Sequence, residues 1–427
     1  MQQNAKPTIL GASRVLAFAL IALAVTANAW AAERVLLNFN GTDGSHPWGN
    51  MVADTAGNLY GVTAAGGIDC PQNNGCGLVF RLSKVSGVWK ETVLHKFTGG
   101  NDGYLPNSLI LDSAGNVYGT TMNGGGRGGS CNQGTDCGVV FQLTPVASGT
   151  WPEKILYRFG GGNGLGPDGL AFDSHGNLFG TTRNGGGGIT TCAPTGGCGV
   201  LFELTPTASV PWTLTVVHVY PYSSSDDPGL PMGLTIGAGD VIYVTSYNEI
   251  VQFTPGAGGW TSSTIHSFGG THNGDGLFPS SVAILDAAGN LYGTTTQGGV
   301  LNYGVVYELS PGSGGDWTES ILHSFGAGSD GKRPDSQLAF DATGNLYGET
   351  INGGGTGGKC GCNGWGAVFK LTPSSSAPWP ESLPVRFALT NGANPQGGLV
   401  LNTDGNLYGE VAQGGAYSGG ALFEVTP

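Results

Sequence analysis

The sequence is poor in charge and in helical patterning. Only 11% of its 427 residues are Asp, Glu, Lys or Arg, and the formal net charge is −13. A mildly acidic, weakly charged surface disfavours nucleic acid and anionic lipid, which attract clustered Lys and Arg. After residue 32 no stretch keeps apolar residues at helical spacing over three turns, so the sequence argues against an α-helical fold.

Familiar catalytic motifs are also absent. There is no Gly-x-Ser-x-Gly, no phosphate loop, no dinucleotide fingerprint and no His-Glu-x-x-His. Gly-rich runs such as 123–126 have no predicted helix after them and do not indicate a phosphate site. The sequence therefore predicts no cofactor and assigns no metal ligand, although a structural cation on the loop face described below is compatible with it.

Long apolar runs are missing as well. The one candidate, residues 15–25, is too short to span a bilayer. Lys6 and Arg14 precede it, and small residues around Ala29 follow it, which is typical of a secretory signal. We predict a signal peptide over residues 1–32, export to the periplasm or medium, and no membrane span in the mature chain; the alternative is an uncleaved anchor.

One short phrase recurs seven times along the chain. It consists of Gly-Asn, an apolar residue, an aromatic residue and Gly. The copies begin at Gly57, Gly115, Gly176, Gly289, Gly344 and Gly405, with a degenerate copy at Gly239. Gly57 and Gly405 are 348 residues apart over six intervals, a mean period of 58 residues. A fixed period of this size indicates a repeat architecture.

Each repeat contains four short apolar or β-branched segments, which we name strands a to d. In the second repeat they are 108–112, 117–121, 138–145 and 151–159, and Asp-x-x-Gly-Asn between the first two favours a hairpin. A four-stranded antiparallel meander cannot bury both faces alone, so the repeats must stack. We predict one all-β domain, a seven-bladed β-propeller over residues 33–427.

The two ends of the chain predict how the ring closes. The sequence ends on strand c of the seventh repeat, so strand d of that repeat is missing. Residues 34–39 match strand d of the other repeats. We therefore predict that the N-terminal strand completes the last blade and leaves no open edge.

The phrases resemble bacterial tandem repeats. Gly-Asn-Leu-Tyr-Gly-Thr-Thr in strand b, Gly-Val-Val-Phe-x-Leu-Thr-Pro in strand c and Trp…Leu-His-Ser-Phe in strand d resemble the GloVer repeats of choice-of-anchor proteins, over nearly the whole mature chain. A weaker similarity is to the Asp-x-x-Gly-Asn-Leu-Trp repeats of sensor-type propellers. The GloVer resemblance implies an exported propeller-like protein and no particular activity. The sequence ends at Pro427 without an anchoring tail, which favours release over surface attachment.

All eight cysteines lie in loops between strands b and c. They come in pairs in four repeats: Cys70 and Cys76, Cys131 and Cys137, Cys192 and Cys198, Cys360 and Cys362. In an exported protein this pattern predicts four local disulfides that fix Gly-rich loops. Metal-bound thiolates are the alternative, but the six-residue spacing is not that of a zinc knuckle.

The b–c loops and the d-to-a linkers of a propeller emerge on one face, and here nearly all variation between repeats falls on them. Trp48, Trp365, His46 and His272 are off-pattern residues of this face and are candidate ligand-binding residues. The linkers also repeat Asp-Gly, which we interpret as turn chemistry rather than as a cation-binding ring. Four histidines hold one place in strand d and are predicted to pack: His95, His218, His266 and His323.

Glu349 and Glu410 replace the Thr that usually follows Tyr-Gly in strand b. Two carboxylates in neighbouring blades are candidate acid and base for glycoside cleavage, or else partly solvated strand residues. These features leave three hypotheses for a chain expected to be monomeric. The first is a binding module for polysaccharide or a cell-surface protein, the second a glycoside hydrolase or lyase, and the third a structural envelope component.

Overall fold

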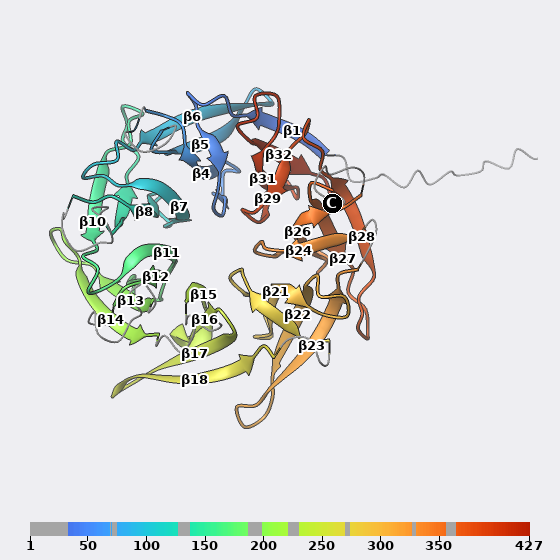
Figure 1. Cartoon of the computed structure of the whole chain (residues 1–427). Helices are drawn as coiled ribbons and strands as arrows, with labels where there is room; N and C mark the ends of the chain where they lie inside the picture. Colours follow the sequence, from blue (N-terminus) through green and yellow to red (C-terminus); the bar gives the residue numbers. More distant parts are fainter. Residues whose placement is uncertain are drawn as a thin grey trace, which may run out of the picture. The chain divides into compact units, whose positions relative to one another are not determined.

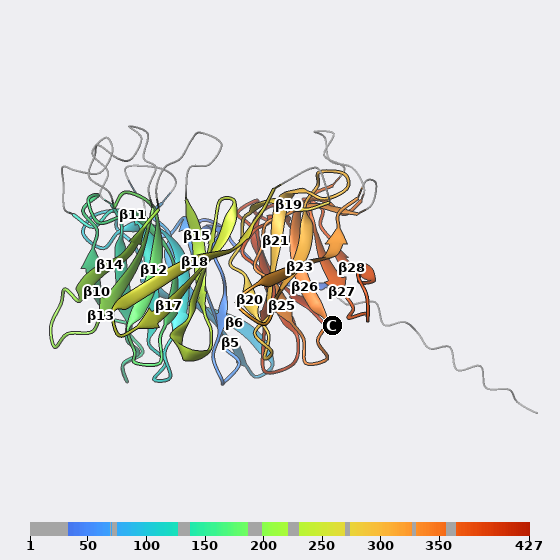
Figure 2. The same ribbon diagram turned by 90° about the horizontal axis from the view of Figure 1, so that it is seen from below.

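Residues 31–427 form one compact unit, in which the strands build seven antiparallel sheets arranged in a ring (Figure 1). The computed structural model describes residues 33–68, 70, 75–126, 137–186, 199–220, 230–269, 274–326, 330–355 and 364–427. The predicted signal peptide lies outside these residues. Viewed from the side, the strands run between the two faces of the ring (Figure 2). The seven-bladed propeller is confirmed.

Each sheet, or blade, has four strand positions, a to d, from the centre outward. Position a holds β2 (Ser45–Pro47) with β3 (Val52–Ala53), β7 (Tyr104–Leu111), β11 (Leu165–Phe172), β15 (Pro231–Ile236), β19 (Gly276–Pro279) with β20 (Ile284–Leu285), β24 (Gly331–Pro334) with β25 (Ala339–Phe340), and β29 (Ala393–Pro395) with β30 (Val400–Leu401). Position b holds β4 (Leu59–Ala65), β8 (Val117–Asn123), β12 (Leu178–Asn184), β16 (Ile242–Ser246), β21 (Leu291–Gly298), β26 (Leu346–Gly353) and β31 (Leu407–Gln413).

The outer positions follow the same order. Position c holds β5 (Leu78–Val85), β9 (Val139–Leu143), β13 (Val200–Thr205), β17 (Glu249–Gly256), β22 (Val305–Pro311), β27 (Ala367–Leu371) and β32 (Ala421–Val425). Position d holds β6 (Val88–Lys96), β10 (Glu153–Arg158), β14 (Thr213–Val219), β18 (Gly259–Ser267), β23 (Trp317–Ser324), β28 (Glu381–Arg386) and β1 (Glu33–Asn38). A short 3-10 turn, η2 (Ala238–Asp240), joins β15 to β16. Among the described residues, no helix has the length and apolar character that a bilayer span requires.

The N-terminal strand closes the ring. β1 pairs antiparallel with β32, from Glu33 opposite Val425 to Asn38 opposite Ala421. In Figure 1 the blue β1 lies beside the red β32, at the outer edge of blade 7. The predicted completion of the last blade is thus confirmed, and the last blade has the same four positions as the others.

Neighbouring blades meet at a recurrent contact between glycine and proline, which we call the Gly–Pro joint. The glycine lies just before strand c, and the proline lies in strand a of the next blade. A Cβ on Gly77 would lie 2.2 Å from the carbonyl oxygen of Thr63 in its own blade and 2.7 Å from Cδ of Pro106, so no larger residue fits between strand b and the proline. The same contact recurs at five further joints: Gly138–Pro167, Gly199–Pro231, Gly304–Pro334, Gly366–Pro395 and Gly420–Pro47. The last of these lies at the seam between blades 7 and 1.

The residue before the proline ties the joint through the backbone. Leu105 has a left-handed φ of 56°, and its N–H donates to the carbonyl oxygen of Cys76 in the preceding blade (3.2 Å). Four more joints have this hydrogen bond: Gly166 to Cys137, Arg333 to Tyr303, Asn394 to Trp365 and His46 to Gly419. A left-handed φ is costly for a residue with a side chain. These bonds and the blade packing hold the residues in that conformation.

Aromatic side chains fill the space between blades. Tyr60 of strand b donates to Asp54 Oδ2 in its own hairpin turn (3.0 Å) and packs edge-on against Trp151 of the next blade. An aromatic contact between strand b and the start of the next strand d recurs, edge-on or tilted, in the pairs Tyr118–Trp212, Phe179–Trp260, Tyr243–Trp317, Tyr292–Trp379 and Tyr408–Trp89. These recurrent aromatic residues thus pack neighbouring blades against one another.

The Gly–Pro joint gives a test of stability. Gly304→Ala places a Cβ 2.1 Å from the carbonyl oxygen of Thr295 in its own blade and 2.7 Å from Pro334 Cδ of the next blade, at a φ of 95°, so it combines a steric clash with backbone strain. Gly289→Ala is the matched control, because it has a similar φ of 88° and no atom within 4 Å of the added Cβ. We expect a loss of about 1 kcal/mol in the control and about 3 kcal/mol or more at the joint. Urea unfolding of both variants measures the difference, and equal losses would contradict the steric role of the joint.

Candidate functional site

Every blade contributes the same sequence position to the wall of a polar central pocket. The position is the residue immediately after the strand-a proline, and we call the set the Pro+1 ring. Its members are Trp48, Asn107, Asp168, Met232, Ser280, Asp335 and Gln396. In six of the seven blades the Gly–Pro joint fixes the proline and with it the backbone of the next residue, while the side chain there differs in nearly every blade. The ring thus presents varied chemistry on a rigid frame.

Neutral hydrogen-bonding groups dominate the pocket, which has a volume of about 110 Å³. Asn50 Nδ2 donates to Gln337 Oε1 (2.8 Å), although blade 7 lies between these two residues in the ring. Asn107 is buried and held on both sides: its amide donates to the carbonyl of Pro167 (3.2 Å), and Thr120 donates to its Oδ1 (2.8 Å). These contacts orient the amides that face the pocket.

Two acidic residues and one arginine add charge to the wall. Arg183 reaches from β12 and donates through Nε and Nη2 to Asp168 Oδ2, at 3.0 and 2.8 Å. Burial raises the pKa of Asp335 above its ordinary value, against the opposing effects of a hydrogen bond with Ser280 and the charges of Arg333 and Arg183. Arg183 balances the charge of Asp168. Most of the other polar groups that line the pocket are uncharged.

The predicted ligand-binding residues fall in different places. Trp48 lines the pocket and keeps 41% of its surface exposed. His46 is exposed beside it in sequence, and its ring Nδ1 lies 2.7 Å from Ser45 Oγ. Trp365 is partly buried against the core shared by blades 6 and 7 and does not line the pocket. His272 lies outside the described residues.

Glu349 and Glu410 are buried within the sheets and do not line the pocket. Glu349 Oε2 accepts the N–H of Gly398 in the next blade (3.0 Å), and Glu349 Oε1 has no hydrogen-bond partner. Both oxygens of Glu410 lack a partner. Burial raises the pKa of Glu349 to about 8 and that of Glu410 well above its ordinary value, where the nearby Glu349 adds to the effect. A catalytic role for the pair stays a prediction, and the geometry favours a structural one.

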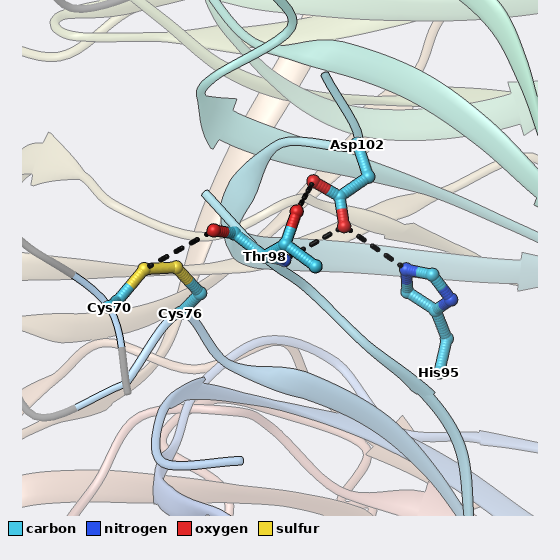
Figure 3. The surroundings of a disulfide bond; sticks show 5 residues. All are labelled: Cys70, Cys76, His95, Thr98 and Asp102. Carbon is cyan, nitrogen blue, oxygen red and sulfur yellow. Dashed lines mark hydrogen bonds and ion pairs between the residues drawn. A yellow bond between two sulfur atoms is a disulfide. The ribbon is translucent and has the colours of Figure 1, made fainter. Parts of the chain in front are cut away.

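One predicted disulfide, Cys70–Cys76, is present in full among the described residues (Figure 3). Cys137 is also disulfide-bonded. The remaining predicted disulfide cysteines, Cys131, Cys192, Cys198, Cys360 and Cys362, lie outside the described residues. Cys70 Sγ lies 3.9 Å from the carbonyl oxygen of Thr98, so this disulfide packs on the linker to blade 2.

A second group of sites appears at the outer edge of the blade joints, and sequence reasoning missed it. Each site, which we call a rim cluster, combines a strand-d His, the Asp of the following linker and a strand-d Glu of the next blade. The described residues contain three: His95–Asp102–Glu153, His266–Asp275–Glu319 and His323–Asp330–Glu381. The four strand-d histidines do pack edge-on against an aromatic residue, as predicted. The Glu recurs four residues before the His position, a periodicity that could have signalled the clusters.

The buried glutamates predict a pH dependence. Because the pKa of Glu349 rises from 4.5 to about 8 on folding, the folded state keeps a proton that the unfolded chain releases. The free energy of unfolding should therefore fall as pH rises from about 4.5 to 8. Glu349→Gln removes this loss, and we expect it to stabilise the protein by up to about 4 kcal/mol at pH 8 and little at pH 4.5. Urea unfolding at both pH values tests this, and a pH-independent difference would contradict it.

Comparisons with solved structures agree with the fold. A streptogramin B lyase aligns with a TM-score of 0.54 and 14% identity, over 93% of this chain and 98% of that chain. Virginiamycin B lyase from Staphylococcus aureus aligns at 0.52 and 13%, over 93% and 99%. The extracellular domain of a putative one component system from B. thetaiotaomicron aligns at 0.54 and 12%, over 92% of this chain and 40% of that chain. At these identities the likeness shows the fold alone.

The sequence comparisons add the family. A search of curated proteins finds no sequence that matches the chain. The family model of the Gloeobacter/Verrucomicrobia repeat matches residues 25–251, 187–377 and 244–427 in overlapping registers. The matches run through all seven blades and the seam between them. The chain therefore belongs to the Gloeobacter/Verrucomicrobia repeat family.

Proposed function

We propose that this protein is an exported binding module that takes a neutral polyhydroxylated ligand, a segment of polysaccharide, at the central pocket on the loop face. The observation that carries the proposal is the Pro+1 ring, which sets Trp48 beside amide and hydroxyl groups of other blades. Flat aromatic surfaces stack on sugar rings, and amides and hydroxyls exchange hydrogen bonds with sugar hydroxyls. The pocket offers both kinds of contact.

The electrostatics of the pocket support a neutral ligand over an anionic one. Arg183 is already paired with Asp168, so an anion would compete with a bonded carboxylate. The chain as a whole carries a formal net charge of −13, which disfavours anionic partners such as nucleic acid. A neutral sugar meets neither obstacle, and it would not have to displace a charge pair.

A binding role is favoured over glycoside cleavage by the placement of the carboxylates. The glutamates predicted to act as acid and base, Glu349 and Glu410, are buried outside the pocket. A general acid must reach the atom that it protonates. Export, the other part of the proposal, is supported by the predicted signal peptide and by fold neighbours that are extracellular domains.

The mature chain should be screened on an array of soluble polysaccharides, with affinity for the best oligosaccharide then measured by calorimetry. Trp48→Ala is expected to weaken binding about tenfold or more, since an aromatic anchor of this kind contributes over 1 kcal/mol. Tyr417→Ala is the matched control: Tyr417 is 66% exposed on a b–c loop of the same face and does not line the pocket. Binding that survives Trp48→Ala, or that depends on Tyr417, would place the site elsewhere.

A further inference from the structure

We propose that His266, Asp275 and Glu319 form a binding site for a divalent transition-metal ion, with Zn²⁺ as the best match, at the joint between blades 4 and 5. The histidine comes from β18, the aspartate from the linker to blade 5, and the glutamate from β23. The site lies at the outer strand position of the blades and is independent of the function proposed above.

The three ligand atoms are spaced as they would be around one ion. His266 Nε2 lies 3.4 Å from Glu319 Oε1 and 3.8 Å from Asp275 Oδ1, and all three atoms lie within 4.8 Å of one another. Neighbouring ligands of a tetrahedral Zn²⁺ are about 3.3–3.6 Å apart, given bonds of about 2.0–2.2 Å. Direct hydrogen bonds between these groups would be nearer 2.8 Å. The cluster is thus slightly open at its centre.

The same three atoms are buried and have no hydrogen-bond partner. Their side chains are only 17–19% exposed. Buried polar atoms without partners are costly and rare in proteins. A single ion between Nε2, Oδ1 and Oε1 would satisfy all three atoms at once, in place of the ion-pair contacts of 3.4 and 3.8 Å that a protonated His266 makes with the two carboxylates.

Surrounding contacts hold two of the ligands in place. The N–H of Gly269 donates to the other oxygen of Asp275, Oδ2 (2.6 Å), which turns Oδ1 toward the histidine. The ring of His266 packs edge-on against Phe268, with ring centroids 4.5 Å apart. Supporting contacts of this kind orient the ligands of metal sites.

The other two rim clusters are less suited to an ion because their aspartates are engaged. In the first cluster Asp102 accepts hydrogen bonds from both the N–H and the hydroxyl of Thr98, at 2.8 and 2.6 Å, one to each oxygen (Figure 3). In the third cluster both oxygens of Asp330 accept backbone N–H groups, from Gly326 and Gly331. Only in the His266 cluster does the aspartate keep an oxygen with no partner.

The ligand set indicates the class of ion. Ca²⁺ and Mg²⁺ take oxygen ligands, and an imidazole nitrogen disfavours both. Soft ions such as Cu(I) prefer thiolates, which are absent from this cluster. One imidazole with two carboxylates suits Zn²⁺, and three protein ligands leave a fourth position for water.

The test is a calorimetric titration of the chelator-treated mature protein with Zn²⁺. We expect one tight site per chain, and His266→Gln or Glu319→Gln should weaken it about 100-fold or more, because each removes a direct ligand. His218→Gln is the matched control: His218 holds the same place in β14, but the next blade has Ser262 at the glutamate position. Co²⁺ in place of Zn²⁺ should give the visible absorption of a tetrahedral site.

Three results would overturn the proposal. These are the absence of Zn²⁺ binding, Zn²⁺ binding that His266→Gln and Glu319→Gln leave unchanged, and binding of Ca²⁺ in preference to Zn²⁺. Should the variants fail to fold, crystals of the unaltered protein soaked with Zn²⁺ decide the question. An anomalous peak between the three side chains supports the site, and its absence there shows that the cluster is an ion pair alone.

Discussion

The structure depends on the close approach of a glycine before strand c to the proline in strand a of the next blade. Because this contact leaves no room for a Cβ, it fixes the spacing of neighbouring blades at six of the seven joints. The backbone bond beside it, such as Leu105 to Cys76, fixes their rotation. Six of the seven joints are set in this way, and β1 completes blade 7 at the seam. The joint thus contributes to closure of the ring as well as to local packing.

The same joint explains why the central pocket can vary without disturbing the fold. Pro47 is held by Gly420, and the following Trp48 extends into the pocket; Pro167 is held by Gly138, and Asp168 follows it. Packing constrains the proline, while the residue after it faces the pocket and is free of that constraint. This propeller therefore separates residues that build the ring from residues that line the pocket, at adjacent positions in the sequence.

Much of the fold could be predicted from the sequence because its signals are local and periodic. The Gly-Asn turns, the four apolar segments per repeat and the missing seventh strand d were sufficient for blade number and closure. The site was harder to predict. Trp48 is recognisable as off-pattern and lines the pocket, but Trp365, which has the same chemistry, is partly buried against the core instead. Glu349 and Glu410 were correctly placed in neighbouring blades, yet no sequence signal shows that their side chains turn into the sheets. The rim clusters join residues of two blades and a linker, so their geometry appears only once the ring is assembled.

The joint between blades 4 and 5 differs from the others, and the difference bears on the rim cluster there. Asn248 stands where the other blades have glycine, and Tyr247 packs against Phe278 of the next blade, with ring centroids 4.6 Å apart. The backbone bond from Phe268 to Asn248 is kept at 2.7 Å, so the blade itself is unchanged. What changes is the contact to blade 5, which lacks the Gly–Pro joint. An ion held by His266, Asp275 and Glu319 would link β18, the linker and β23 at this point, and its binding free energy would add to the stability of the ring by mass action. The rim cluster whose ligand atoms have the fewest hydrogen-bond partners therefore lies at the joint that lacks the Gly–Pro contact. An ion that links the two blades would add most to the stability of the ring at that joint.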